Sequence, residues 1–384
     1  MVGPVEGAPI WGSQVAWKGY HVPFEAAQHA RGRGKYEKGQ LMPRYALWNN
    51  KGGVGKSFLT FALACEYALK NPDEDVLVLD LCPQANLTEM LFGDHEDAPS
   101  HIDHFYTQKP RRSIGGYFEA RLTSPFLPLS DISPFITRPA DFNENIPENL
   151  YLVPGDNLLE LLAEAIRQAS QMPLPMDAWS KVMRWLLDLI KSFSEASEAS
   201  DVTAFVDCNP SFSVYTQIAL CSAEFLIVPF TADDSSRRGI ENVFALLYGV
   251  ADNELKGYAR LSFSKRATEE KIDLPRLHTF VNNRVTMYKS QPSSAFEAKS
   301  QPIREIVGQA HAASKKIFVG HSSVTQLFAQ MPDYHSVAVV ASSEGCPLSQ
   351  LQSGHHTIDG KVVQVNQTAI DKYTKAVAKL VQRL

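Results

Sequence analysis

The stretch NNKGGVGKS at residues 49–57 constrains the fold of this chain more than any other. It follows a short apolar run, RYALW (44–48), and leads into KSFLTFALACEYALK (56–70), which has helical spacing. Another apolar run, DVLVLD (75–80), comes next and has the β-branched character of a strand buried on both faces. Strand, loop, helix and strand in this order predict a right-handed βαβ unit with a glycine-rich loop.

This loop has the features of a phosphate site. Glycines at a helix N-terminus form an anion site, because backbone N–H groups point outward and the helix dipole adds partial positive charge. Gly52, Gly53 and Gly55 supply the freedom to curl around phosphates. Lys56 is expected to reach the β- and γ-phosphates, and Ser57 to ligate Mg²⁺. A glycine-rich turn that binds nothing is the alternative, which the agreement of context, lysine and hydroxyl disfavours.

Two residues depart from the common pattern G-x-x-x-x-G-K-[ST]. Asn50 stands where that pattern has glycine, and Lys51 follows it. Lys51 comes too early in the loop to reach its own phosphates easily. It is expected to reach a phosphate in a facing subunit, as a point charge that acts like an arginine finger supplied in trans. A solvated surface lysine is the alternative interpretation.

Apolar runs and helical patterns alternate along the rest of the chain. Further buried strands are predicted at 149–154, 202–207, 224–230, 277–283 and 336–342. Helical patterns lie at 157–169, 177–193, 211–222 and 239–250. This alternation predicts an α/β fold, with a mostly parallel, doubly wound sheet covered by helices on both faces.

The alternation also suggests the domain organisation. It runs from residue 44 to the end, so residues 44–384 are predicted to form a single large domain, with insertions near 94–147 and 252–276. Residues 1–43 are predicted to be an N-terminal arm with scattered aromatic residues and a small basic run. The arm either docks its aromatic side chains on the body or contacts DNA or a partner.

The charge balance limits how this chain can bind nucleic acid. Its net charge of −5 excludes a basic field over the whole molecule, so DNA binding requires a local patch. The five cysteines form no CxxC pair, which suggests neither a disulfide framework nor a zinc site. With no membrane-length apolar run and no signal-peptide pattern, the interpretation is a cytoplasmic protein. The candidate DNA patches, each alternatively a solvated helix face, are Arg237 with Arg238, Lys315 with Lys316, and Lys372 with Lys375, Lys379 and Arg383.

Together these motifs resemble those of the ParA/MinD family of ATPases, and most closely the ParA-type partition ATPases. NKGGVGKS (50–57) resembles the family's deviant P-loop (deviant Walker A), in which the early lysine is the signature residue. VLVLDLCPQANLT (76–88) resembles its second motif, D-x-D-P-Q-G-N-x-T, and TAFVDCNPSF (203–212) its Walker B segment. FVNNRV (280–285) resembles the strand whose terminal Asn contacts adenine. The resemblance covers 44–384 in order and implies a P-loop NTPase fold that binds ATP/ADP with Mg²⁺.

The resemblance also implies roles for individual residues. Lys51 and Asp80 are the implied catalytic residues, and Ser57, Asp80 and Asp207 the implied metal residues. Asn282 is the alternative to Asn283 for the contact with adenine. The implied nucleotide-binding residues are Lys51, Gly52, Gly53, Val54, Gly55, Lys56, Ser57, Phe58 and Asn283.

Cys82 is the departure from the family pattern, because it stands where the second motif has its second Asp. In the family that Asp orients the attacking water, and a neutral thiol is a weak hydrogen-bond acceptor. Phosphoryl transfer depends mostly on positioning and charge, so binding and dimer formation are expected to survive. Slow hydrolysis is therefore expected. A redox role is the alternative, which no adjacent His or Cys supports.

The resemblance implies an ATPase that sandwiches ATP in a homodimer, binds DNA non-specifically and partitions plasmid or chromosome DNA. A ParB-like protein would trigger release, and the protein would associate with the nucleoid. The alternatives are a MinD-like ATPase that positions itself at membranes or poles, and an ATP-gated scaffold with little turnover. The C-terminal helix bears on the membrane alternative, since its apolar face either packs on the sheet or enters a bilayer. That face carries Ile370, Tyr373, Val377, Leu380, Val381 and Leu384.

Overall fold

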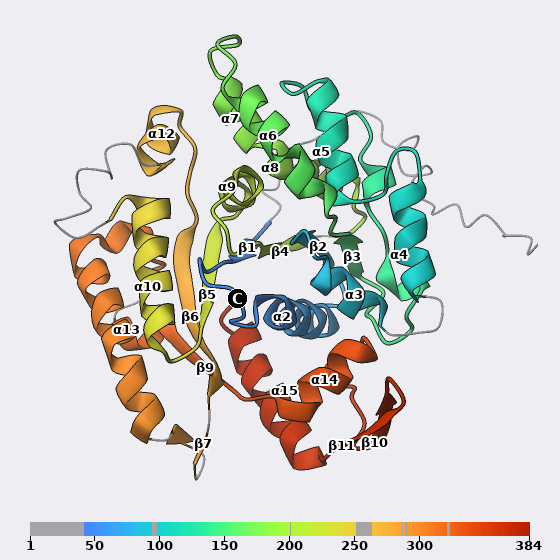
Figure 1. Ribbon diagram of the computed structural model, residues 1–384, viewed down its shortest axis with the longest axis vertical. Coiled ribbons are helices and arrows are strands. Elements are labelled where there is room, and N and C mark those ends of the chain that lie inside the picture. Colours follow the sequence, from blue (N-terminus) through green and yellow to red (C-terminus); the bar gives the residue numbers. More distant parts are fainter. Residues whose placement is uncertain are drawn as a thin grey trace, which may run out of the picture. The chain divides into compact units, whose positions relative to one another are not determined.

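A parallel β-sheet forms the centre of this chain (Figure 1). The computed structural model describes residues 42–93, 98–199, 201–250, 263–285, 287–288, 291–292, 294–320 and 323–384. The predicted N-terminal arm lies outside these ranges, except for its last two residues. Within them the central sheet has seven strands in the order β3-β2-β4-β1-β5-β6-β9, and every pairing is parallel. The predicted α/β fold is therefore confirmed.

The strands and helices alternate along the chain as the apolar patterns predicted. The sheet strands are β1 (Arg44–Leu47), β2 (Asp75–Leu81), β3 (Leu150–Val153), β4 (Val202–Cys208), β5 (Phe225–Phe230), β6 (Arg276–Val285) and β9 (Phe328–Pro332). The α-helices are α2 (Lys56–Lys70), α3 (Asn86–Phe92), α4 (Ala98–Thr107), α5 (Ile114–Thr123), α6 (Leu158–Ser170), α7 (Ala178–Met183), α8 (Trp185–Ala196), α9 (Val214–Ser222), α10 (Asp234–Asn242), α12 (Phe263–Glu269), α13 (Ser294–Ala313), α14 (His335–Ser343) and α15 (Gln367–Val381). Two small hairpins pair β7 (Met287–Tyr288) with β8 (Gln291–Pro292) and β10 (Gly354–Ile358) with β11 (Lys361–Val365).

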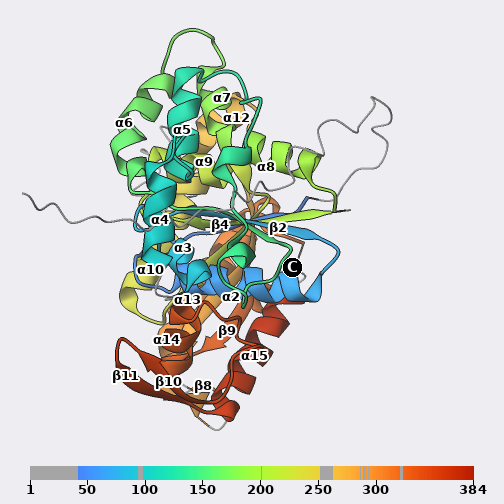
Figure 2. The same cartoon turned by 90° about the vertical axis from the view of Figure 1, so that its right-hand side faces the viewer.

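Helices cover both faces of the sheet, and strand β1 shows why. Its side chains alternate, so Ala46 joins one hydrophobic core with residues of α5 to α9, while Tyr45 and Leu47 join the other with residues of α2, α14 and α15. Figure 2 shows α2, α14 and α15 on one side of the sheet and α5, α6 and α8 on the other. Burial on both faces explains the continuous apolar runs of the central strands.

The prediction of a strand at 336–342 is wrong. These residues form the helix α14, and the seventh strand is β9, which the sequence pattern did not reveal. Val337, Val340 and Ala341 are buried, whereas Val339 is 52% exposed. That spacing is helical, and a short run of valines and alanines does not by itself distinguish a strand from a helix.

Other segments differ from the expected pattern in smaller ways. The helix predicted at 177–193 is divided at Arg184 into α7 and α8. The hairpin β10–β11 was not expected, although its turn contains Asp359 and Gly360, both with positive φ, which is a strong hairpin signal. Helices α4 and α5 lie within 94–147, and α12 lies within 252–276, of which 252–262 are outside the described residues. The division into an arm and a domain with insertions stays a prediction.

The C-terminal helix α15 packs against the body of the protein. Its residues Ile370, Tyr373, Val377 and Leu380 are buried in the same core as α2. The structure therefore supports packing of this apolar face within the protein rather than its insertion into a bilayer. Across the described residues, none of the helices combines the length and the apolar character needed to cross a membrane.

Candidate functional site

The loop that joins β1 to α2 has the geometry of a phosphate cradle. Gly53 and Gly55 have φ angles of 73° and 79°, in the left-handed region that favours glycine, and α2 begins at Lys56. The Lys56 side chain is 7% exposed, and its Nζ donates a hydrogen bond to the Lys51 carbonyl oxygen at 3.3 Å. Burial lowers the pKa of Lys56, while the nearby Asp207 opposes that effect. The cation is thus held inside the curve of the loop, where a bound phosphate would lie.

Asn283 lies directly against this loop. Its Nδ2 donates to the Val54 carbonyl oxygen at 2.9 Å, and its side chain is buried. Asn282, the alternative for the adenine contact, instead donates to Ser300 Oγ at 3.0 Å. Of the two asparagines, Asn283 is therefore the one in contact with the phosphate loop.

Asp80 and Asp207 lie side by side at the carboxyl ends of β2 and β4. They are directly paired in the strand register, and both are buried. Burial raises the pKa of each carboxyl group above its usual range, and the proximity of Asp80 raises that of Asp207 further. A bound cation would relieve this repulsion, since an opposite charge favours the ionised form.

The surroundings of Asp207 fit a divalent metal ion. Within the described part of the chain, both of its carboxylate oxygens are buried and neither accepts a hydrogen bond of ordinary geometry. The Ser57 and Thr60 hydroxyls lie close enough to lower the Asp207 pKa. Carboxylate and hydroxyl oxygens are the ligands that Mg²⁺ prefers, and an unpartnered buried carboxylate is costly without a cation. Ser57, Asp207 and the neighbouring Asp80 are therefore a suitable set for Mg²⁺.

Thr88 is a residue of this site that the sequence interpretation did not single out. Its backbone N–H and its hydroxyl both donate to Asp80 Oδ2, at 3.0 and 2.9 Å, and the Gly155 N–H donates to the Thr88 hydroxyl at 2.8 Å. The signal was present, since Thr88 is the final residue of D-x-D-P-Q-G-N-x-T. Ala85 replaces the glycine of that motif and adopts a φ of 54°, so the loop keeps the left-handed residue that the motif requires.

Gly155 is a second residue in contact with this site that only the structure reveals. Its close packing can be tested by mutation. A Cβ at this position would lie 2.7 Å from Asp80 Oδ2 and 2.8 Å from the Ala85 Cα. We expect Gly155→Ala to lower the free energy of unfolding by about 1–3 kcal/mol, because backbone atoms must shift. Denaturant unfolding measures this, with Gly308→Ala as the control, because no atom lies within 4 Å of its Cβ. The control should stabilise helix α13 by about 0.5–1 kcal/mol. Equal effects would contradict the close approach.

Cys82 lies just beyond the end of β2, half-buried beside the two carboxylates. Its N–H donates to Asp80 Oδ1 at 3.0 Å. Burial and the charge of Asp80 raise the pKa of the Cys82 thiol to about 11. The thiol is therefore protonated at neutral pH. It offers neither a negative charge to orient water nor the thiolate that redox chemistry requires.

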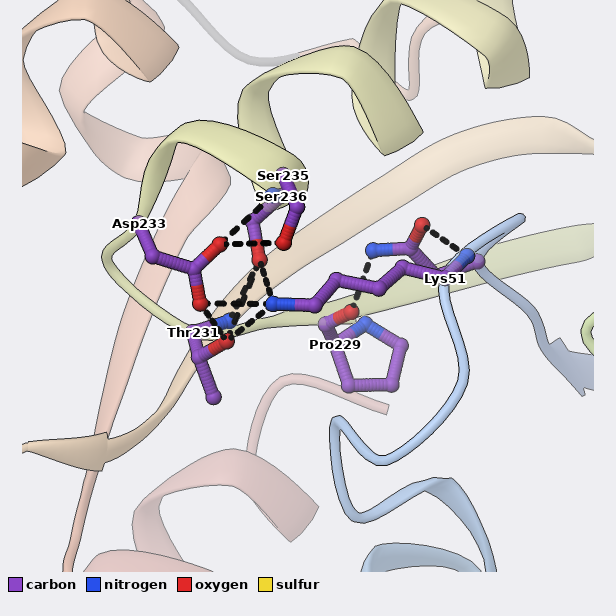
Figure 3. Close-up of polar contacts among 7 residues, drawn as sticks. Lys51, Pro229, Thr231, Asp233, Ser235 and Ser236 are labelled. Carbon is purple, nitrogen blue, oxygen red and sulfur yellow. Dashed lines mark hydrogen bonds and ion pairs between the residues drawn. The ribbon is translucent and has the colours of Figure 1, made fainter.

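Lys51 is directed into its own chain. Its Nζ lies 2.6 Å from Asp233 Oδ2 and 3.0 Å from Thr231 Oγ1, in the segment that connects β5 to α10 (Figure 3). The preceding Asn50 donates to the Pro210 carbonyl oxygen at 3.1 Å. Lys51 is therefore not a solvated surface lysine. In this conformation its ammonium group is bound within its own chain and is not directed towards a facing subunit.

The side chains of Val54 and Phe58 are both buried, which leaves only their backbone groups to face the loop. The Phe58 ring packs on Tyr334, with the ring centroids 4.7 Å apart. By contrast, Gly52 and Gly53 are exposed, and Ser57 is half-buried. The implied nucleotide-binding residues of the loop are thus contiguous, and Asn283 joins them from β6.

Comparison with known proteins places this site in a family. Residues 44–257, more than half of the chain, match the family model AAA_31, described as an AAA domain. A search of the curated proteins found no match. Among solved structures, apo McdA from Cyanothece has a TM-score of 0.55 and 15% identity, over 88% of this chain and 99% of that chain. A single-residue variant of Cyanothece McdA in complex with ATP has a TM-score of 0.53 and 15% identity, over 90% and 98%.

A third similar structure is protein DIP2308 from Corynebacterium diphtheriae, with a TM-score of 0.52 and 16% identity, over 79% of this chain and 97% of that chain. At such identities the three structures establish the fold alone. The family match covers the phosphate loop, both carboxylates and the segment that holds Lys51. The resemblance inferred from the motifs is confirmed at the level of family and fold: the chain belongs to the AAA domain family AAA_31, and its fold is that of the similar solved structures.

Proposed function

We propose that this protein is a ParA-like ATPase that binds ATP with Mg²⁺ in a sandwich dimer of two identical chains. In the ATP state it binds DNA non-specifically and takes part in the partition of plasmid or chromosome DNA. The observation that carries the proposal is the phosphate loop, with Lys51 ahead of its glycines and the unpartnered Asp207 carboxylate beside it. The ATP complex of the Cyanothece McdA variant, which has the same fold, supports the choice of nucleotide.

Each residue of the site has a proposed task. Lys56 and the N–H groups of the loop hold the phosphates, and Asn283 contacts adenine. Ser57 and Asp207 hold Mg²⁺, and Asp80 supports its water shell. When bound, Mg²⁺ neutralises charge on the phosphates. Lys51 acts on the nucleotide of the facing chain.

Slow hydrolysis is part of this proposal. Phosphoryl transfer needs a group that orients the attacking water, and the neutral Cys82 thiol is a weak acceptor for that purpose. An ATP-gated scaffold with little turnover is therefore the second candidate function, favoured by this cysteine. The MinD-like alternative loses its main support, because the apolar face of α15 is buried in the protein.

A basic groove between α15 and the edge strand β9 is the proposed DNA surface. Its volume is about 620 Å³, and Arg383 Nη1 donates to the Phe328 carbonyl oxygen at 3.0 Å on that edge. Arg304 joins the groove from α13, a contribution that the sequence did not reveal. In contrast, Arg237 is paired with Glu241 at 2.6 Å. The basic residues that line the groove are Arg304, Lys372, Lys375, Lys379 and Arg383.

Replacing Lys375 and Lys379 together with alanine should weaken the binding of duplex DNA about tenfold or more in the ATP state. It should also reduce the slope of log affinity against log salt by about 2, because each phosphate contact contributes about 0.9. Fluorescence anisotropy over a salt series, with and without ATP and Mg²⁺, measures both quantities.

Lys315→Ala with Lys316→Ala is the matched control, since it removes the same charge from a 3₁₀ turn outside the groove. Equal losses in both double variants would contradict the groove as the DNA surface. DNA binding by the wild type that is equally tight without nucleotide would contradict the ATP-gated function itself. A ParB-like activator is the proposed protein partner, and stimulation of turnover by such a protein in the presence of DNA would support it.

A further inference from the structure

The ammonium group of Lys51 is enclosed by a small network in its own chain. Besides Asp233 and Thr231, it donates to Ser236 Oγ at 3.2 Å (Figure 3). We propose that residues 231–236 form a latch that holds Lys51 in cis and must release it before a second copy of this chain can close on the nucleotide. This inference rests on the proposed function, in which Lys51 acts on the facing chain.

The latch is held in place by contacts that do not involve Lys51. Asp233 caps helix α10, where its Oδ1 accepts from the Ser236 N–H at 2.8 Å. Its Oδ2 accepts from the Thr231 hydroxyl at 2.8 Å. The carboxylate is thus oriented by α10 whether or not the lysine is present, and it offers Lys51 a preformed anionic site.

The Asp233 carboxylate also keeps its negative charge when the pH changes. Burial alone would raise the Asp233 pKa, but Lys51 and the donors of Ser236 and Thr231 together hold it well below its usual range. The carboxylate therefore stays ionised at any physiological pH. The Lys51 side chain is 22% exposed and the Asp233 side chain 44%, so the shielding from solvent is mainly at the lysine end of the ion pair.

Only the side chain of Lys51 has to move when the latch opens. Its backbone N–H donates to Asn49 Oδ1 at 3.0 Å, and Asn49 Nδ2 donates to the Pro229 carbonyl oxygen at 2.8 Å. These bonds fix the start of the phosphate loop against β5. A lysine stem is flexible, so the ammonium can exchange the Asp233 carboxylate for a phosphate of the facing chain without refolding the loop.

The latch makes dimer formation a competition for one ammonium group. Both chains must release Lys51, so the apparent dissociation constant of the dimer is raised by the inverse square of the fraction of chains in which it is released. A latch that is closed in roughly two chains of three thus weakens the dimer about tenfold. Bound nucleotide in both chains supplies the competing phosphates.

Asp233→Asn tests this proposal without removing the cap. Asn is as good an N-cap as Asp and has nearly the same shape, so the change keeps the cap at Oδ1 while it removes the negative charge and the acceptor oxygen that Lys51 uses. Asp234→Asn is the matched control, because the next residue loses the same charge but contacts Lys299, at 3.7 Å, rather than Lys51. Sedimentation equilibrium with a non-hydrolysable ATP analogue and Mg²⁺ measures the dimer dissociation constant, and thermal unfolding checks that both variants fold.

The expected result is a dimer about tenfold tighter in Asp233→Asn and within about twofold of the wild type in Asp234→Asn. In the nucleotide-free monomer, reductive methylation followed by mass spectrometry should also modify Lys51 several-fold faster in Asp233→Asn than in Asp234→Asn. A wild type that dimerises while Asp233→Asn dimerises no more tightly overturns the latch and leaves the proposed function standing. A wild type that stays monomeric with the analogue and Mg²⁺ overturns the proposed dimer and the latch with it.

Discussion

Replacing Cys82 with aspartate should raise the rate of ATP hydrolysis about 10- to 100-fold. The substitution places a carboxylate beside Asp80 and Asp207, at the position where the family motif has one. A carboxylate accepts a strong hydrogen bond and can orient the attacking water, and such groups contribute factors of about 10²–10⁴ in enzymes. The wild-type thiol, with its pKa raised to about 11, lacks that charge at neutral pH. Steady-state phosphate release at saturating ATP measures the change.

Cys82→Asn is the control for this experiment, because an amide of nearly the same size adds no negative charge. It should leave turnover within about threefold of the wild type, which corresponds to less than about 1 kcal/mol in the activation free energy. ATP affinity should change little in either variant, since binding depends on the phosphate loop and Mg²⁺. A Cys82→Asp variant that binds ATP but shows no faster turnover would contradict the assigned role of position 82.

Replacing Lys56 with methionine should weaken ATP binding about 100-fold or more. Methionine preserves most of the buried stem and removes the ammonium group, which lies inside the curve of the loop. Charge-assisted contacts to phosphate are among the strongest polar interactions, and this one is shielded from solvent. Isothermal titration calorimetry with a non-hydrolysable ATP analogue and Mg²⁺ measures the affinity.

Lys70→Met is the matched control, because it makes the same change at the other end of helix α2. Lys70 is exposed, and its Nζ donates to the Ala378 carbonyl oxygen at 3.1 Å, far along the helix from the loop. Its affinity for the analogue should equal that of the wild type. If Lys56→Met retains tight binding, the phosphate loop is not the nucleotide site.

The strands that bracket the phosphate loop were predictable because their signals are local. β1, β2 and β4 are buried on both faces, and a two-sided core requires continuous apolar runs. Strand β9 lies at the edge of the sheet, where Phe328 and Ala329 are only half-buried, so its sequence FAQMP has no such run. The valines of α14 do form such a run and were misassigned to a strand, because a short apolar run does not by itself distinguish a strand from a helix.

The residues of the loop and the two carboxylates belong to short motifs, so their identity could be inferred from the sequence. Among their partners, Thr88 also belongs to a short motif, but Gly155 and Asp233 could not be inferred in this way. These two act through contacts whose members are separated in the chain by up to 182 residues. Contacts of this kind depend on how strands are ordered in the sheet. The order β2-β4-β1-β5 cannot be inferred from any single stretch of the sequence.

The sequence by itself determined the class of fold, the phosphate loop, the implied metal residues and the missing acid at Cys82. Each of these rests on residue types at short spacing, which local backbone geometry translates directly into structure. Only the tertiary structure decided where Lys51 points, which basic residues share a groove and what covers the apolar face of α15. Those questions concern side chains whose partners come from distant strands and helices, and their answers depend on packing rather than on pattern.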